Sequence, residues 1–343
     1  MGKSPKIFWD ARSKKLSKKK RRKFHYHNNL YKDKSRPKTN QQQYIPDYYI
    51  DVPGCFSFII NMEETTLFFK EMMDRLKKAM PKSDFLINLQ NVSEVTTDAV
   101  MYLIALMRNH KESRKRLYSF HGNYPTNELA RNTFIESGFL KFVNSRSRRL
   151  PEKSSKMSIV CGTNSDAVSA KQICLFVADK LEISTSYVKD LYEFIIEMMS
   201  NVYYHAYNGD EDTMLPEWYM YAEHIQDKVN FLFLDTGLGI GKTVQKHSLY
   251  EKVINKVGVG SESKLIKSAL NGDFRTQTGE INRGKGLPSI KEYACKNKIE
   301  SFHILSGRGH CWFENQSVVC HQELKYNLYG TIYIFTIKKV EEP

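Results

Sequence analysis

Hydrophobic residues at helical spacing mark the strongest element that the sequence predicts, a helix over Ser184–Tyr207. Ser184 stands at its start, where a hydroxyl can cap free backbone N–H groups. The apolar stripe of this helix is formed by Leu191, Phe194, Met198 and Val202. A second stripe repeats every four residues and so occupies one other face; it holds Glu193, Glu197, Asn201 and His205. Two carboxylates, an amide and an imidazole in line are an unusual choice for a face that only meets water.

Residues 48–145 alternate short apolar runs with amphipathic stretches. The predicted strands are Tyr49–Val52, Cys55–Ile60, Phe85–Leu89 and Leu117–Phe120, and the predicted helices are Thr66–Met80, Asp98–Asn109 and Asn127–Ser137. This alternation predicts a mixed or parallel sheet with helical cover.

Residues 146–158 are rich in Arg, Lys and Ser and are interpreted as a linker. The pattern becomes helical again from Ile159, and residues 159–340 are expected to form a second α/β domain. Its further elements are the strands Val229–Leu234, Ser301–Leu305, Ser317–Cys320 and Gly330–Ile337 and the helix Pro288–Cys295. The polar stretch over 241–282 contains four glycines after Gly241, a composition that suits a mobile loop.

The positive charge is concentrated at the N-terminus. Residues 1–40 hold fifteen Lys and Arg against two Asp, so they carry +13 of the net charge of +14. Residues 1–45 show no hydrophobic periodicity and are expected to be a disordered basic arm. The arm also contains Phe24, Tyr26 and Tyr31, which could stack on bases, so nucleic-acid binding and a merely solvated tail both stay open.

Composition favours a cytoplasmic protein with reduced thiols. No apolar stretch approaches the roughly 20 residues that a membrane-spanning helix needs. The six cysteines are scattered without a Cys-x-x-Cys pair. The pairs His310-Cys311 and Cys320-His321 can be drawn as zinc ligands. Neighbouring residues of a strand point to opposite faces, however, so the four side chains do not converge easily.

Two glycine-rich segments follow the predicted helix. Val229–Leu234 ends on Asp235, and Gly237 and Gly239 come next, where the absence of a Cβ lets a ligand approach the backbone. The second segment, Arg283-Gly284-Lys285-Gly286-Leu287, opens a helix. Glycines before a helix N-terminus present backbone N–H groups to phosphate oxygens, and Lys285 could add its charge.

The three segments, in this order, resemble the nucleotide pocket of the GHKL ATPases, the superfamily of gyrase, heat-shock chaperone, histidine-kinase and mismatch-repair ATP sites. The resemblance covers about residues 160–340 and implies a two-layer α/β sandwich, the Bergerat fold, that binds Mg-ATP. It assigns the Mg²⁺ ligand to Asn201, the general base to Glu197 and the adenine contact to Asp235. It also makes the stretch 241–282 the ATP lid and places Thr331 near the adenine.

Residues 48–145 are similar to the STAS domain of anti-sigma-factor antagonists. The similarity rests on Phe85–Leu89, on the turn Val92–Thr97 before a helix, and on the ending Glu136-Ser-Gly-Phe-Leu-Lys-Phe142. Family members carry a phosphorylated Ser at the helix start, where this chain has Thr96-Thr97. Thr97 is therefore a candidate phosphoacceptor, or alternatively a helix N-cap.

Within the superfamily, anti-sigma-factor kinases fit best. No histidine lies between His121 and His205, so a sensor kinase's phosphoacceptor helix is missing, and no transducer domain follows the last expected strand. The expected function is a regulatory Mg-ATP-binding protein, an ATPase or a Ser/Thr kinase. Its phosphate acceptor would be a STAS-type or sigma-factor-like partner or its own STAS-like domain, and a homodimer is implied by the same resemblance. The alternative is a nucleic-acid-associated switch that uses the basic arm.

Overall fold

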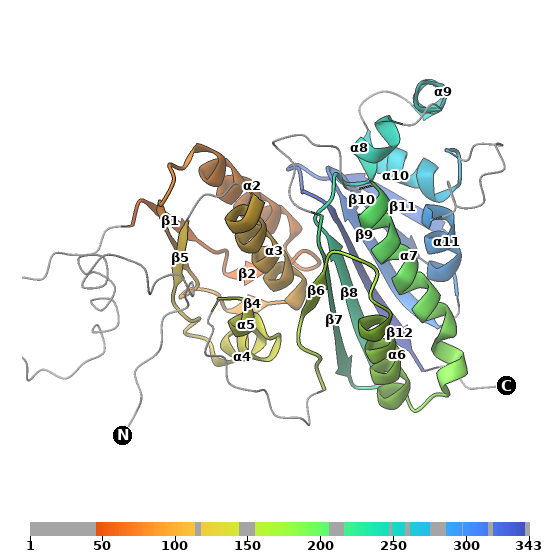
Figure 1. The fold of residues 1–343 in the computed structure, drawn as a ribbon, viewed down its shortest axis with the longest axis horizontal. Helices are drawn as coiled ribbons and strands as arrows, with labels where there is room; N and C mark the ends of the chain where they lie inside the picture. The colour runs from red at the N-terminus through yellow and green to blue at the C-terminus, as the bar shows by residue number, and fades with distance from the viewer. Residues whose placement is uncertain are drawn as a thin grey trace, which may run out of the picture. The chain divides into compact units, whose positions relative to one another are not determined.

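The structure is a computed structural model that describes residues 46–113, 118–143, 155–205, 216–246, 249–257, 261–274, 286–296, 298–314 and 318–339. The chain divides into two compact units, Met1–Leu150 and Pro151–Pro343, and each is described by itself. Both combine helices with β-sheet (Figure 1), which confirms a mixed α/β fold class. No helix in the described part of the chain is both long and apolar enough to cross a membrane.

The N-terminal unit is built on a parallel three-stranded sheet with the order β1-β3-β5. Strands β2 and β4 form a separate two-stranded parallel sheet. The strands are β1 (Tyr48–Asp51), β2 (Cys55–Phe56), β3 (Asp84–Asn88), β4 (Glu94–Val95) and β5 (Ser119–Gly122). The helices are α2 (Met62–Lys78), α3 (Thr97–Ser113), α4 (Glu128–Glu136) and α5 (Phe139–Val143). Parallel neighbours need crossover connections, and α2 and α3 supply them.

Aromatic packing fills the core of this unit. Phe69 meets Phe58 in a stacked arrangement and Tyr102 edge to face, so rings of α2 and α3 interlock. Phe85 on the central strand is fully buried and stacks on Tyr48 of the neighbouring strand. The helical spacing of the apolar residues therefore predicted the correct buried faces.

The C-terminal unit contains a seven-stranded sheet with the order β11-β10-β9-β12-β8-β7-β6, and its described pairs are all antiparallel. The strands are β6 (Val160–Gly162), β7 (Trp218–Ile225), β8 (Lys228–Asp235), β9 (Ile299–Ser306), β10 (Gly309–Glu314), β11 (Val318–Glu323) and β12 (Thr331–Lys338). The helical elements are α6 (Ala167–Leu181), η2 (Thr185–Val188), α7 (Lys189–His205), α8 (Ile240–Gln245), α9 (Tyr250–Val257), α10 (Glu262–Leu270) and α11 (Gly286–Ala294).

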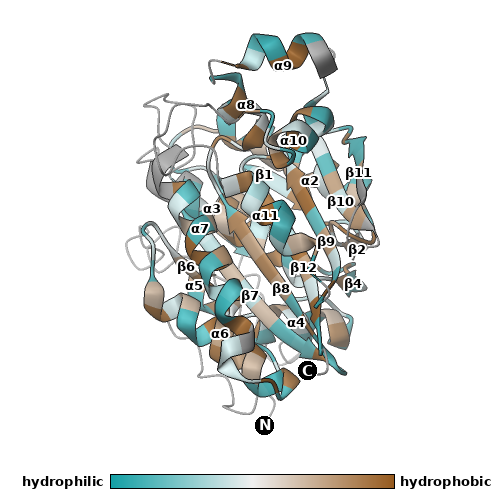
Figure 2. Cartoon of the chain, turned by 90° about the vertical axis from the view of Figure 1, so that its right-hand side faces the viewer, coloured by the Kyte–Doolittle hydropathy of each residue, from teal (hydrophilic) through white to brown (hydrophobic). Residues whose placement is uncertain are grey.

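Helices α6, α7, α10 and α11 pack on one face of this sheet and share one hydrophobic core with it. Alternate residues of β8, Val229, Phe231 and Phe233, point into this core. Strand β8 is largely brown in Figure 2, whereas the covering helices carry both colours, as amphipathic helices do. The arrangement is an α/β layer pair whose helices can hold a site against one end of the sheet.

Two sequence predictions in the N-terminal and linker-proximal regions need correction. The strand expected over Cys55–Ile60 ends at Phe56, because the hydroxyl of Ser57 accepts hydrogen bonds from the N–H groups of Ile59 and Ile60 and closes a turn. The helical pattern expected from Ile159 begins later. A short strand, β6, comes first, and Asp166 then caps α6 by accepting from the N–H groups of Val168 and Ser169.

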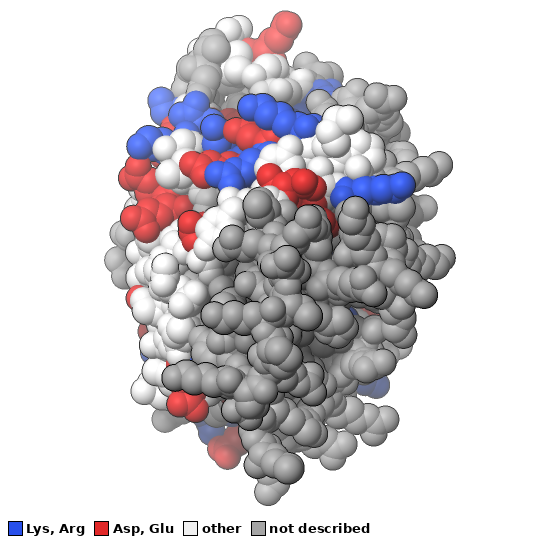
Figure 3. Space-filling model, turned by 90° about the vertical axis from the view of Figure 1, so that its left-hand side faces the viewer, with Lys and Arg blue, Asp and Glu red and all other residues white. Residues whose placement is uncertain are grey.

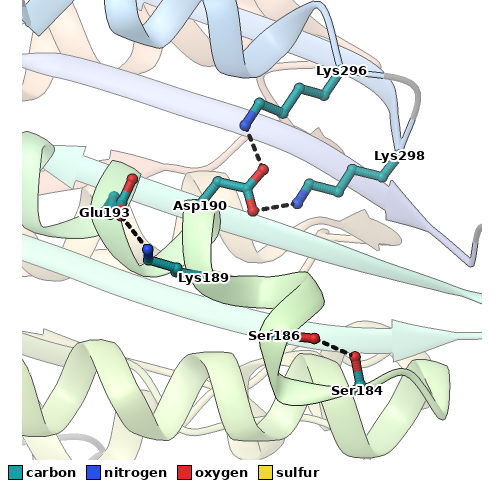
Figure 4. A network of polar contacts seen from close by, with 7 residues as sticks. All are labelled: Ser184, Ser186, Lys189, Asp190, Glu193, Lys296 and Lys298. Atoms are coloured by element: carbon teal, nitrogen blue, oxygen red, sulfur yellow. Dashed lines mark hydrogen bonds and ion pairs between the residues drawn. The ribbon is translucent and has the colours of Figure 1, made fainter. Parts of the chain in front are cut away.

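The strongest predicted helix is present, but it starts later than expected. Ser184 precedes the short helix η2 and makes no capping bond; its hydroxyl lies 2.7 Å from that of Ser186 (Figure 4). The regular helix α7 begins at Lys189. Strands β7 and β10 were not predicted. In β7 both faces are buried over most of its length, so the strand lacks the alternation that periodicity detects.

Candidate functional site

Helix α7 presents Glu197 and Asn201 on a face that the sheet does not cover. Both side chains are half-buried, while Phe194, Met198 and Val202 on the adjoining side belong to the core. Glu193, one turn earlier, is exposed, and its Oε1 lies 3.8 Å from Nζ of Lys189, so it forms a surface ion pair. The side chain of His205 lies outside the described residues. The polar stripe therefore has two parts. Glu193 is exposed to solvent, whereas Glu197 and Asn201 form a half-buried end.

The first residue of α11 comes into direct contact with this half-buried end. A Cβ on Gly286 would lie 2.8 Å from Nδ2 and 2.9 Å from Oδ1 of Asn201, and 2.9 Å from Oε1 of Glu197. Real Cβ atoms essentially never approach other atoms so closely, so only glycine leaves the ends of these two side chains where they are. Leu287 packs against the core. The preceding predicted residues Arg283, Gly284 and Lys285 lie outside the described part of the chain.

Glu197 is a desolvated carboxyl group. Its side chain makes no hydrogen bond or ion pair with any residue that the structure describes, and burial raises its pKa above the ordinary value. A carboxyl group that lacks internal partners is available to a ligand. A raised pKa also makes it a stronger proton acceptor than a solvated glutamate, as a general base requires.

A row of polar side chains crosses the end of the sheet. Asp235 is the last residue of β8, paired with Trp218 of β7 on one side and Thr331 of β12 on the other. Thr331 in turn pairs with Ser306 at the end of β9. Strand alternation points Asp235 to the helical side, two residues after Phe233. In Figure 1, the carboxyl ends of β8 and α7 lie at the same end of this unit.

Asp235 is a deep carboxyl group that still keeps part of its surface accessible. Burial raises its pKa to about 6, although hydrogen bonds from Gly237 and Thr331 lower the pKa in part. The N–H of Gly237 donates to Oδ1 at 2.9 Å. Such a carboxylate is energetically costly when charged, unless a bound group donates further hydrogen bonds to it.

Ser306 organises this end of the sheet and was missed by sequence reasoning. Its fully buried hydroxyl accepts from the N–H of Ile240 at 2.8 Å, donates to the carbonyl of Gly330 at 3.0 Å, and lies 3.2 Å from the hydroxyl of Thr331. Gly239 has φ +82° and leaves no room for a Cβ, which would lie 2.9 Å from the Ser306 hydroxyl. No local motif surrounds Ser306 in the sequence; its role arises only from the strand register.

The expectation of one mobile loop over 241–282 is wrong for the described part of that stretch. It contains α8, α9 and α10, and α10 is an integral part of the core through Leu265, Ile266 and Leu270. Glu262 at the start of α10 accepts a hydrogen bond from the N–H of Arg308. The many Ser, Lys and Glu residues of α10 masked its amphipathic spacing. Residues 275–285 lie outside the described chain.

Thr97 does not offer an accessible hydroxyl. It is the first residue of α3, and only 3% of its surface is exposed. Thr96 precedes it, and the Thr96 hydroxyl donates to the carboxylate of Asp98. Phosphate transfer to Thr97 would require this turn to open.

The zinc ligands considered in the sequence separate as strand geometry dictates. Cys311 points into the core, where its thiol donates to the carbonyl of Ser263, while His310 contacts His303 and Gln322. Among the described residues, no group of three or more His, Cys, Asp or Glu is placed to hold a metal ion.

Comparison with known proteins does not assign the chain to a family. No protein-family model matches the chain, and no curated protein matches its sequence. The geometry of the site therefore carries the functional argument.

Replacing Gly286 by alanine tests the close approach of α11 to α7. Helix propensity alone predicts that alanine stabilises a helix by about 1 kcal/mol relative to glycine. A Cβ at this position must push the ends of the Asn201 and Glu197 side chains aside, so we expect this gain in the free energy of unfolding to be lost, as measured by chemical denaturation. Ser289→Ala, at an exposed position of the same helix, is the control. A stabilising Gly286→Ala would contradict the packing described.

Replacing Asp235 by asparagine tests the burial of its charge. Because the folded-state pKa is raised, the folded protein binds this proton more tightly than the unfolded chain. The resulting stability is present below about pH 4 and is lost as the pH rises through about 6. The unfolding free energy of Asp235→Asn minus that of the original protein should therefore increase between pH 4 and 7, by up to about 3 kcal/mol. A difference that stays constant with pH would refute the desolvation of Asp235.

Proposed function

We propose that residues 159–340 bind Mg-ATP in a pocket of the GHKL type, within a two-layer sandwich of the Bergerat fold. The observation that carries this proposal is the convergence of Glu197 and Asn201 with the backbone of Gly286. A helix start that is kept free of side chains presents its N–H groups to an anion, and a carboxylate and an amide oxygen stand beside it. This combination suits a triphosphate with its cation better than it suits an uncharged ligand.

The pocket would recognise the nucleotide base through the polar residues at the end of the sheet, Asp235, Thr331 and Ser306. Asp235 can accept a hydrogen from the amino group of adenine, whereas guanine presents a carbonyl oxygen at that position. Such a bond would relieve the cost of the buried charge, since the carboxylate gains a donor in a place where water is scarce. Thr331 and the Ser306 hydroxyl hold the neighbouring backbone in place.

The residues present fit a Mg²⁺ ion that is bound mainly through phosphate. Mg²⁺ prefers oxygen ligands and, in nucleotide sites, keeps water and phosphate oxygens in most of its positions. One amide oxygen, Oδ1 of Asn201, can serve as the protein's ligand, so a cluster of carboxylates is not required. When bound, the ion would neutralise phosphate charge.

Glu197 would act as the general base. It stands one turn before Asn201 on the same face, and its raised pKa and lack of partners among the described residues suit proton abstraction from water or from a hydroxyl. Plain hydrolysis and transfer to Ser or Thr both require this step, so the geometry supports either reaction. Arg283, Gly284 and Lys285 remain proposed phosphate contacts on the grounds of sequence.

We further propose that the N-terminal unit is STAS-like, because its parallel β1-β3-β5 sheet with α2 and α3 as crossovers is compatible with that resemblance. A partner of the STAS type, or a sigma-factor-like regulator, would then be the target of the nucleotide-dependent switch. A homodimer remains a further proposal. The burial of Thr97 favours a hydroxyl of a partner, or water, over Thr97 as the first acceptor.

The nucleic-acid alternative depends on residues 1–40, which lie outside the described residues. On the face shown in Figure 3, the described Lys and Arg side chains are interspersed with Asp and Glu. Helix α2 forms such mixed pairs, for example Lys70 with Asp74. The described charges of this face thus form no single-sign patch for a phosphate backbone, and the alternative rests on the charge of residues 1–40.

The proposal is tested by incubating the full chain with Mg²⁺ and γ-labelled ATP while free phosphate and labelled protein are followed together. Glu197→Ala should lower either product at least about a hundredfold while ATP still binds, because the base is lost. Asn201→Ala should weaken the binding of Mg-ATP. Glu193→Ala, on the exposed end of the same stripe, is the matched control and should behave like the original protein. Equal product from Glu197→Ala would contradict the assigned base.

A further inference from the structure

Helices α7 and α11 lie side by side and run in opposite directions. The start of α11, at Gly286, meets the later part of α7 at Asn201. The residues after its end, Lys296 and Lys298, meet the first turn of α7 at Asp190. The two helices are thus joined at both ends. The two points of contact lie about 16 Å apart along α7, because eleven residues separate Asp190 from Asn201.

The joining residues fall on one stripe of each helix. On α7 they are Asp190, Phe194, Glu197 and Asn201, spaced by four, three and four residues along the border between its apolar and polar stripes. On α11 they are Gly286 and Tyr293, with the buried Ile290 four residues after the first and three before the second. These spacings place each set on a single face, so the helices meet along their length and not at one crossing point.

An aromatic pair lies between the two ends. The rings of Phe194 and Tyr293 stack with centroids 4.3 Å apart and planes 17° from parallel. Both residues are buried, and the Tyr293 hydroxyl has no hydrogen-bond partner among the residues that the structure describes. The phenol contributes here through its ring, and the pair can act as a pivot between the ionic end and the glycine end.

The ionic end of the helix pair, formed by Asp190, Lys296 and Lys298, contains two ion pairs. Asp190 binds both lysines, with Nζ of Lys298 2.9 Å from Oδ1 and Lys296 on Oδ2 (Figure 4). Lys298 is almost fully buried, which makes its loss of a partner costly. Burial would raise the pKa of Asp190, but the hydrogen bonds from the two lysines hold the pKa below its ordinary value.

We propose that Asp190, held by Lys296 and Lys298, is a positioning residue for the nucleotide site: it fixes the far end of α11 and thereby keeps Gly286 against Glu197 and Asn201. This inference rests on the proposed function, since it assigns a role in Mg-ATP binding to a residue remote from the phosphates. Release of the ionic end lets α11 pivot about the Phe194–Tyr293 stack. Gly286 then moves relative to Asn201, and a shift of about 1 Å is enough to impair a phosphate site.

The inference also predicts which part of the nucleotide is affected. Asp235 and Thr331 lie at one end of β8 and β12, whereas Lys298 meets β12 at its opposite end, where its carbonyl accepts a hydrogen bond from the N–H of Lys338. Loss of the ionic end should therefore weaken binding of the phosphates and the cation while the affinity for adenosine stays the same.

The test compares Asp190→Asn with Asp190→Glu in the full chain. Glu193→Gln, an exposed ion-pair residue on the same helix, is the matched surface control, and Tyr293→Phe keeps the ring stack while removing the unpartnered hydroxyl. Amide hydrogen exchange of α11 is measured first, without nucleotide. Asp190→Asn should accelerate exchange over Gly286–Tyr293 about tenfold or more relative to β8, and Asp190→Glu, which retains the charge, should recover part of the protection.

Equilibrium binding of Mg-ATP and of adenosine is measured next on the same proteins. Asp190→Asn should weaken Mg-ATP binding about tenfold and adenosine binding less than about twofold, while both controls match the original protein. Unchanged exchange in α11 would overturn the positioning role whatever the nucleotide result. Equal losses for Mg-ATP and adenosine would overturn it as well, because they would indicate general destabilisation. Failure of the original protein to bind Mg-ATP would instead overturn the proposed function.

Discussion

The approach of the Gly286 backbone to the side chains of Glu197 and Asn201 is the constraint on which the C-terminal unit depends. It combines a glycine at the start of α11, a half-buried polar face on α7, and a fixed spacing between the two helices. The core beneath them provides that spacing, since Phe194 on α7 and Tyr293 on α11 both pack on Phe335 of the sheet. Close packing transmits such constraints because interiors leave little space for adjustment.

The same unit contains two carboxyl groups whose burial costs folding free energy when they are charged. Glu197 and Asp235 are both desolvated carboxyl groups whose pKa values are raised by burial, and neither charge is compensated by a described lysine or arginine. Ion pairs are formed elsewhere, as between Asp190 and two lysines. A fold that isolates two carboxylates in this way gives up stability at neutral pH, which is typical of a site that a ligand completes.

Much of the site could be predicted because its signals are local. The polar stripe of α7 follows from helical periodicity within one segment, and Gly239 and Gly286 mark places where the backbone has no room for a side chain. Ser306 could not be found in this way, because it meets Thr331 only through the register of β9 against β12. Helix α10 was predicted as part of a loop because its Ser, Lys and Glu residues outnumber its apolar residues. Tertiary packing nevertheless buries the apolar residues of this helix. The mixed α/β class followed from alternation of the two periodicities, whereas β7, buried on both faces, left no such pattern.

The most direct test of the central claim is the equilibrium binding of Mg-ATP and Mg-GTP to the full chain, measured by titration calorimetry under identical conditions. The account predicts a saturable single site for Mg-ATP and binding of Mg-GTP that is weaker by about a hundredfold or more, because the Asp235 carboxylate would face a carbonyl oxygen in place of a donor. Equal affinity for the two nucleotides, or no binding of either, would contradict it.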